Sequence, residues 1–234
     1  MNYFSYLLDA SHWSGDGGIG QLLLQHLEYT VVAVLIGAVI AIPLGIFIGH
    51  TGRGGFLIIG VSNAARAIPS LGLLVLVVLL TGSGFAPTVL VLAVLALPAI
   101  LTATAVGISG AEPDAVYAAR ALGMTGGQVV RKVEWPLAVP LVISGLRSAT
   151  LQVVATATVA AFAAGGALGQ LLINGQASSD YPQMFAGAVL VAGLAVVLDL
   201  LIGGIGLLAA RRVRGRRRAA SRDSTVAAGV SAHA

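Results

Sequence analysis

Long stretches without a charged side chain constrain this chain more than any other feature of its sequence. No Asp, Glu, Lys or Arg occurs in stretches of 24, 45 and 32 residues, which cover 29–52, 67–111 and 148–179. A helix that crosses the hydrocarbon core of a bilayer needs about 20 consecutive apolar residues. The chain is therefore predicted to cross a membrane several times.

The composition agrees with a membrane protein and excludes several other classes. Hydrophobic residues make up 57% of the 234 residues and charged residues 9%, against roughly 25% charged residues in a soluble domain. The 13 basic and 9 acidic side chains are too few to cover a soluble enzyme. The apolar content excludes a disordered chain. Without cysteine, the chain has no disulfide, thiolate metal site or cysteine nucleophile.

The predicted fold class is an all-α, polytopic membrane protein with five transmembrane helices. The expected helices lie at about 27–49, 57–81, 87–110, 137–163 and 184–210. Pro43, Pro69 and Pro98 fall inside the first three, where neighbouring groups can satisfy the carbonyls that a proline leaves free. The glycine-rich run 165–169 is either a re-entrant gate segment or a flexible outer loop.

The charges divide the chain into three regions. Residues 1–26 form an arm for which we expect no cleavable signal peptide, 27–210 form the transmembrane domain, and 211–234 form a basic tail expected to be disordered. With five passes, every connection on the side of the N-terminus lacks Lys and Arg. Because basic loops favour the cytoplasm, we expect the N-terminus outside the cell and the C-terminus in the cytoplasm. A basic tail beside a membrane is more typical of this orientation than of a nucleic-acid site.

Two sets of residues inside the expected helices are candidates for function. Asn63, Arg66, Pro69 and Ser70 form a polar break, and interrupted helices with polar neighbours often line a transport pathway. The plainer interpretation of the other prolines is a simple kink.

Arg147 and Asp199 lie in the last two expected helices, about 16–18 Å from the same membrane face. An unpaired charge at that depth is costly, so the two residues are a candidate intramembrane ion pair. Alternatively, Arg147 extends toward the cytoplasm and Asp199 bonds to hydroxyl or backbone groups.

The loop at 111–136 carries the most specific pattern. Residues 114–122 can form a short helix that begins with acidic residues and stops at Gly123, which suits the docking of another protein. The loop reads Tyr117-Ala118-Ala119, then Gly123 after three residues, then Val133-Glu134-Trp135-Pro136 after nine more. This spacing resembles the cytoplasmic E-A-A…G…I-x-L-P signature of the permease subunits of bacterial ABC importers. Tyr117, Val133 and Trp135 depart from the signature's residue types.

Further segments resemble the glycine betaine/carnitine/choline branch of these permeases, the osmoprotectant importers. They are Arg66-Ala67-Ile68-Pro69-Ser70, Leu97-Pro98, residues 164–169 and Leu198-Asp199-Leu200. The resemblance covers roughly residues 20–210. It implies the type I importer permease fold, a place in the bacterial plasma membrane, and a transport function for glycine betaine, choline, carnitine or proline.

The resemblance also implies partners and a coupling site. The partners are ABC ATPase subunits, a second permease subunit (identical or homologous) and an extracytoplasmic substrate-binding protein. The ATPase-coupling residues it implies are Tyr117, Ala118, Ala119, Gly123, Val133 and Pro136. The chain cannot hold a P-loop, because its one lysine, Lys132, is followed by Val133. Its four histidines are too scattered for a metal site. We therefore expect that the chain is not an enzyme and that it has no catalytic residues, no metal and no cofactor.

Two alternatives remain at this point. A secondary transporter or channel without an ATPase predicts internal repeats and several buried charges, neither of which is clear in the sequence. A membrane scaffold without transport would not need the loop spacing over 20 positions.

The expected orientation can be tested by labelling. Cysteines introduced at Gly84 and Ser178 should react with a membrane-impermeant thiol reagent added to intact cells, whereas a cysteine at Ser221 should not. The chain has no native cysteine, so the labelling reports on the introduced position alone. Labelling of position 221 in intact cells would contradict the orientation.

Overall fold

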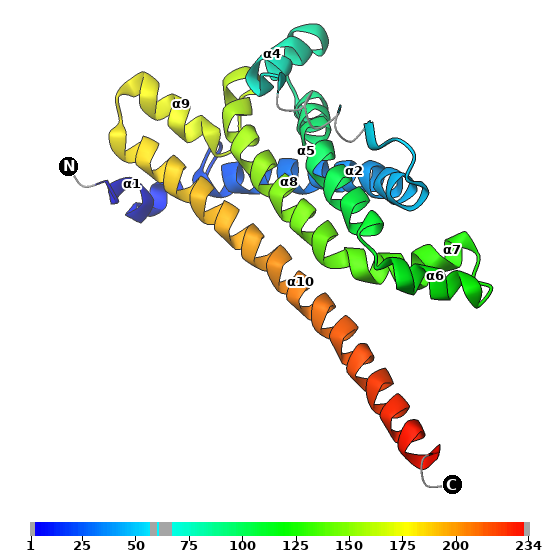
Figure 1. The fold of residues 1–234 in the computed structure, drawn as a ribbon. Helices are drawn as coiled ribbons and strands as arrows, with labels where there is room; N and C mark the ends of the chain where they lie inside the picture. Colours follow the sequence, from blue (N-terminus) through cyan, green and yellow to red (C-terminus); the bar gives the residue numbers. More distant parts are fainter. Residues whose placement is uncertain (1–2, 57–59, 61–66, 232–234) are drawn as a thin grey trace.

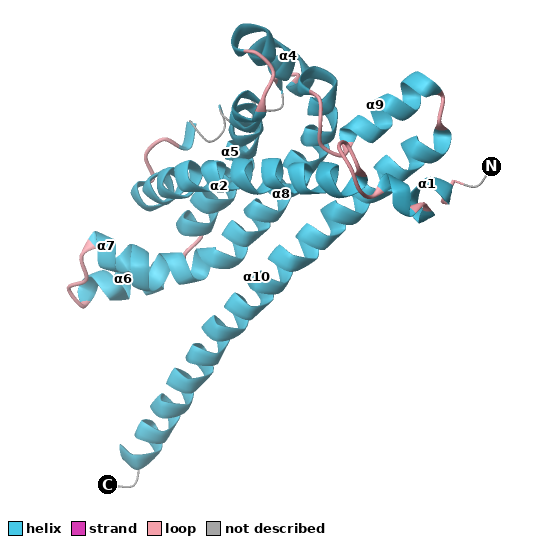
Figure 2. Cartoon of the chain, turned by 180° about the vertical axis from the view of Figure 1, so that it is seen from behind, coloured by secondary structure: helices cyan, strands magenta, loops and turns pink. Residues whose placement is uncertain are grey.

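The structure is a computed structural model that describes residues 3–56, 60 and 67–231, with side chains described up to residue 207. Within these residues the regular elements are all helices, and no strand occurs among them (Figure 2). The all-α fold predicted from the sequence is therefore confirmed for the described part of the chain.

The helices follow one another along the chain as labelled in Figure 1. A short arm comes first, long helices form the body, and two short helices and a π-helix form the largest loop. In order they are α1 (Ser5–Leu8), the 3-10 helix η1 (Ala10–His12), α2 (Ile19–Thr51), α4 (Ser70–Thr81), α5 (Phe85–Ser109), α6 (Pro113–Ala121), α7 (Gly126–Val129), the π-helix η2 (Val130–Glu134), α8 (Trp135–Ala164), α9 (Gly169–Ser178) and α10 (Tyr181–Ser231).

Four described stretches are long and apolar enough to cross a membrane. They are Ile19–Thr51, Phe85–Ser109, Gly126–Ala164 and Tyr181–Leu207. The second expected helix, 57–81, is described only in part, as the 12 residues of α4. Twelve residues span about 18 Å, less than the hydrocarbon core of a bilayer. The expected total of five spans therefore stays a prediction.

The structure differs from the sequence prediction at three helix boundaries. Pro69 was expected inside a helix but is the residue that precedes α4, because a proline has no N–H to donate and fits best at a helix start. Helix α2 begins at Ile19 rather than near 27. Helix α10 continues to Ser231, through the tail for which the sequence predicts disorder; arginine and alanine, which are frequent there, are both strong helix formers.

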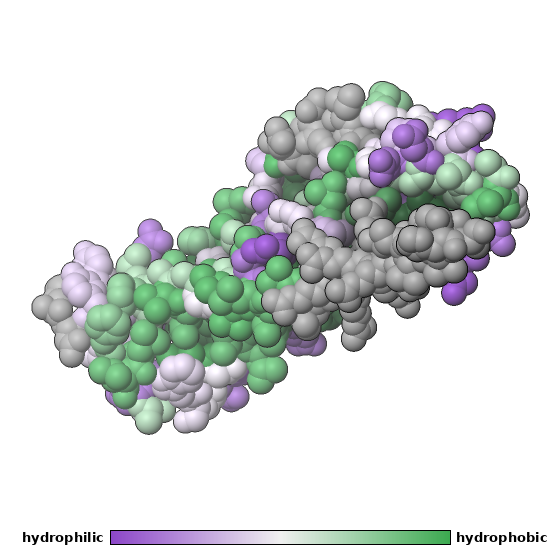
Figure 3. Space-filling model, turned by 60° about the horizontal axis from the view of Figure 1, so that its bottom comes forward, coloured by the Kyte–Doolittle hydropathy of each residue, from purple (hydrophilic) through white to green (hydrophobic). Residues whose placement is uncertain are grey.

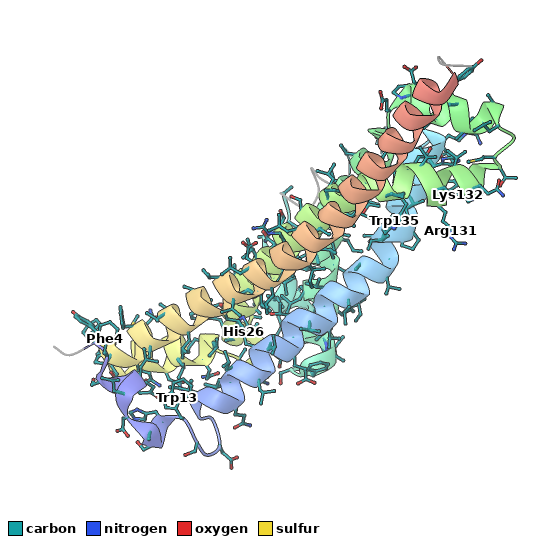
Figure 4. All side chains as sticks on the ribbon, turned by 90° about the horizontal axis from the view of Figure 1, so that it is seen from below. Phe4, Trp13, His26, Arg131, Lys132 and Trp135 are labelled. Carbon is teal, nitrogen blue, oxygen red and sulfur yellow. The ribbon has the colours of Figure 1, made fainter. Side chains whose placement is uncertain are left out.

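The molecule is elongated, and its two ends differ in character. Helices α1 and α9 and the start of α10 lie at one end, whereas α6 and α7 lie at the other (Figures 1 and 4). Figure 4 places Phe4 and Trp13 at the first end and Arg131 and Lys132 at the second. Between them the space-filling view is mostly apolar, and hydrophilic groups gather toward the end that carries α6 and α7 (Figure 3).

Glycines on α2 allow this helix to lie very close to α5. A Cβ built on Gly45 would lie 2.6 Å from Thr104 Cβ, and one built on Gly49 would lie 2.6 Å from the Ala105 carbonyl oxygen. Real Cβ atoms do not approach other atoms so closely. In membranes, such small residues let helix backbones approach and gain van der Waals contact. The Gly45-x-x-x-Gly49 pattern therefore marks a tight helix–helix contact.

Replacement of Gly45 by Val should loosen the contact between α2 and α5. The added side chain must displace Thr104 or the backbone of α5, and overpacking of this kind costs about 1–3 kcal/mol. The check is the melting temperature of the purified variant in detergent. Gly193→Val is the matched control, because no atom lies within 4 Å of a Cβ built on Gly193. Equal melting temperatures for the two variants would contradict the tight contact.

Candidate functional site

Helix α6 forms the exposed first half of the 111–136 loop, and its sequence explains both of its ends. Pro113 lies in its first turn together with Asp114, whose negative charge suits a helix start, and Arg120 lies in its last turn. Gly123 follows the helix with φ +79°, the left-handed conformation that the sequence predicts for it. The Gly123 N–H donates to the Arg120 carbonyl at 2.9 Å, which closes the end of the helix.

The outer face of α6 is unusually exposed for its residue types. Tyr117 is 77% exposed, whereas Ala119, on the opposite side of the helix, is 5% exposed; Leu122, which follows the helix, is 79% exposed. Ala118 is also exposed. A large aromatic and a large aliphatic side chain on a short protruding helix are typical of a surface that another protein covers.

The second half of the loop, α7 and η2, runs without a break into the long helix α8. Thr125 caps α7 in a reciprocal arrangement with Gln128, and α7 passes through η2 into α8. Val133 and Pro136 lie in η2 and at the start of α8, and both are half-buried. Helix α6 packs against α7 and η2. The structure thus brings the two halves of the 20-position pattern side by side.

A cavity of about 710 Å³ lies in the body of the molecule between α4, α5 and α8. Its polar lining consists of neutral groups, four hydroxyls and one amide. These groups belong to Ser70, Thr102, Ser144, Ser148 and Gln152. Gly145 also lines it, and a side chain at this position would collide with Ala103 of α5. The cavity is therefore a neutral, hydrogen-bonding recess in an otherwise apolar bundle.

The pathway residues predicted from the sequence are only partly placed. Ser70, the first residue of α4, lines the cavity, and Pro69 precedes it at the start of the helix. Asn63 and Arg66 lie outside the described residues. Their assignment to a pathway stays a prediction.

The polar face of α8 was missed in the sequence, although a signal for it was present. Ser144, Ser148 and Gln152 recur every four residues within the expected helix 137–163, and residues four apart share one helix face. In the structure all three face the cavity. A search for polar residues at this spacing in each expected helix would have found them.

Arg147 and Asp199 lie together in the structure and join α8 to α10. Arg147 Nε donates to Asp199 Oδ1 at 2.7 Å and Arg147 Nη2 donates to Asp199 Oδ2 at 2.6 Å. This is the bidentate geometry that makes arginine–carboxylate pairs strong and specific. Gly203, one turn further along α10, lies against the guanidinium, since a Cβ built on it would be 3.5 Å from Arg147 Cζ. The pair and the adjacent glycine fix the lengthwise register of the two helices.

The acidic and histidine side chains of the described residues do not gather into a metal site. Among the residues that the structure describes, no group of three or more His, Cys, Asp or Glu side chains could hold a metal ion.

These features define an integral membrane protein of the transport class: apolar spans, a neutral cavity between them, and a short exposed helix at one end. The chain belongs to the family of binding-protein-dependent transport system inner membrane components, whose family model matches residues 41–219. It is thus a multi-pass inner membrane protein and the permease subunit of an ABC importer.

Characterised relatives extend the match over most of the chain. The chain is 33% identical over 186 residues to the glycine betaine/carnitine/choline transport system permease protein OpuCB of Bacillus subtilis, an alignment that covers 78% of this chain and 86% of the relative. It is 32% identical over 207 residues to the osmoprotectant import permease protein OsmW of Salmonella typhimurium, which covers 86% of this chain and 94% of the relative. The branch inferred from the sequence is confirmed by these relatives.

A solved transporter shares the fold. The structure resembles a chain of the MetNI methionine ABC transporter in an inward-facing conformation, with a TM-score of 0.69 and 25% identity over 86% of this chain and 99% of that chain. The expected importer permease fold is therefore confirmed.

The Arg147–Asp199 pair should be more costly to break than to remove. Arg147→Met and Asp199→Leu each leave one charge without its partner among apolar groups, whereas the double variant leaves neither. We therefore expect each single variant to melt at a lower temperature in detergent than the double variant. A double variant that loses as much stability as the two single variants combined would contradict a coupled pair.

Proposed function

We propose that this chain forms the translocation pathway of an ATP-driven importer for osmoprotectants: the quaternary ammonium compounds glycine betaine, choline or carnitine, or the amino acid proline. The observation that carries the proposal is the exposed helix α6 in the signature loop of a chain whose relatives are permeases named for glycine betaine, carnitine and choline or for osmoprotectants. The family match favours this function over a transporter or channel without an ATPase.

The signature loop is the coupling site in this proposal. Tyr117, Ala118 and Ala119 present α6 to an ABC ATPase subunit, and Gly123 ends that helix so that the chain can turn back. Val133 and Pro136 connect the turn to η2 and α8. The support is the exposure of Tyr117 together with the burial of Ala119. Nucleotide-driven movement of the ATPase subunits would thereby act directly on α8.

The neutral cavity is the part of the pathway that this subunit contributes, and a second permease subunit completes it. Tight binding of a quaternary ammonium group usually requires an aromatic cage, whereas the polar side chains that line this cavity are hydroxyls and an amide. Such a lining can solvate a small zwitterion without holding it strongly. The affinity for substrate therefore resides in the extracytoplasmic binding protein.

The orientation proposed is N-terminus outside and C-terminus in the cytoplasm. Arg131 and Lys132 lie beside the proposed coupling site, at the end opposite Phe4 and Trp13 (Figure 4), which agrees with the preference of basic loops for the cytoplasm. On this basis 1–26 is an extracytoplasmic arm, although α2 begins within it, 27–210 is the permease domain and 211–234 is a cytoplasmic tail.

The proposal is tested with the assembled transporter. The chain is co-purified with the ATPase subunits and the binding protein of the same importer, and the complex is reconstituted in proteoliposomes. Glycine betaine, choline, carnitine and proline are then compared for their stimulation of ATP hydrolysis and for uptake. Uptake without ATP hydrolysis, or hydrolysis that none of the four stimulates, would contradict the proposal.

Gly123→Asp should abolish transport while the protein still inserts into the membrane. A non-glycine residue in the left-handed conformation costs about 1 kcal/mol or more, so the end of α6 must rearrange and its outer face moves. The measurement is osmolyte uptake together with retention of the ATPase subunits during purification. Gly127→Asp is the matched control, because Gly127 lies in the same loop, has no atom within 4 Å of its built Cβ, and has no positive φ. Normal uptake by Gly123→Asp would contradict the docking role of α6.

A further inference from the structure

A histidine at the end of α2 makes a buried contact with the signature loop. His50 lies in the last turn of α2, and Glu134 is the last residue of η2. His50 Nδ1 donates to both carboxylate oxygens of Glu134, at 2.9 Å to Oε1 and 2.8 Å to Oε2. Glu134 is only 5% exposed. A carboxylate this deeply buried requires a hydrogen-bonding partner.

The imidazole of His50 is held between two parts of the loop. Its Nδ1 faces Glu134, and its other ring nitrogen, Nε2, would lie 3.2 Å from a Cβ built on Gly126, the first residue of α7. A larger residue at position 126 would press on the ring. His50 therefore contacts both the beginning and the end of the segment that joins the docking helix to α8.

The packing of the loop makes η2 the connection between α6 and the membrane helices. Helix α6 packs on α7 and η2, and η2 in turn packs on α2, α5 and α8. A cavity of about 750 Å³ separates α6 from the ends of α2 and α5, and both His50 and Glu134 line it. Movement of α6 thus reaches α2 through η2.

We propose that the contact between His50 and Glu134 is a positioning contact that forces α2 to follow the docking helix when the ATPase subunits move; this rests on the proposed function of the loop. If α2 and η2 moved apart, the Glu134 carboxylate would remain buried without its partner, which is strongly unfavourable. Residues 50 and 134 therefore move as one unit. Helix α2, closely packed on α5, then carries the movement to the far side of the bundle.

The test is the coupling ratio of the complete importer in proteoliposomes: substrate imported per ATP hydrolysed. His50→Ala and Glu134→Ala should each lower this ratio roughly fivefold or more, the range typical of coupling between sites. The coupling ratio of the double variant should be no lower than that of the more impaired single variant, since each single substitution already removes the contact. The ATPase subunits should co-purify as with the unmodified chain, because α6 itself is unchanged.

Three further variants separate a positioning role from a general loss of structure. Glu134→Gln keeps an oxygen that can accept from His50 and should retain most of the coupling, whereas Glu134→Asp withdraws the carboxylate by one methylene and should not. Thr51→Ala is the matched control, because Thr51 is exposed on the same turn of α2 and its hydroxyl donates to the Phe47 carbonyl of its own helix.

Several results would overturn the proposal. They are an unchanged coupling ratio in both alanine variants, independent losses that multiply in the double variant, or loss of the ATPase subunits from variants at position 50 or 134. If the alanine variants do not fold and insert into the membrane, equal coupling in Glu134→Gln and Glu134→Asp would overturn it instead. Failure of the proposed function is a different result, since the unmodified complex would then show no ATP-dependent uptake.

Discussion

The close packing of α2, α5 and α8 is the constraint on which the rest of the structure depends. Inside a bilayer the hydrophobic effect does not hold helices together, because lipid tails are as apolar as the side chains. Association therefore relies on short-range contact, which requires small residues. Gly45 and Gly49 allow α2 to lie against α5. Gly107 allows α5 to lie against α8, since a Cβ built on it would be only 3.1 Å from Ala138 Cβ. Because these three helices are fixed relative to one another, they also set the positions of the cavity and of the loop at 111–136, which joins α5 to α8.

Several buried threonine hydroxyls of the membrane-spanning helices are satisfied within their own helix, which leaves them no role in helix association. The buried hydroxyls of Thr30, Thr104 and Thr150 each donate to the carbonyl four residues earlier, at 2.8 Å. A hydroxyl bonded in this way has its hydrogen-bond donor satisfied within its own helix, so it does not direct the helix to a particular neighbour. Long-range polar contacts such as Arg147–Asp199 and His50–Glu134 are therefore the ones that specify how particular helices meet.

The sequence was sufficient for the fold class, for most of the long helices and for the signature loop, since each depends on local composition or spacing. Gly123 is an example, because its helix-ending role follows from its neighbours. The contact between His50 and Glu134 could not be found in this way. The two residues are 84 positions apart in the sequence, and whether they meet depends on the axial register of α2 against α5. The start of α4 at Ser70 was missed for a related reason, since a proline is compatible with both a kink and a new helix start.

The continuity of η2 and α8 connects the loop at 111–136 to the cavity through a single helix, along which the proposed movement would pass. Helix α8 is 30 residues long and follows Glu134 directly. At 1.5 Å per residue, Gln152 lies roughly 27 Å from Glu134 along the same helix. A small tilt at η2 therefore becomes a larger displacement of Ser148 and Gln152 at the cavity. The π-helix supplies a place where this tilt can occur, because its wider turn is less tightly hydrogen-bonded than an α-helix and is often found at functional sites. Between Glu134 and Gln152, the contact of Arg147 with Asp199 also joins α8 to α10, so the same helix connects the loop, the cavity and α10.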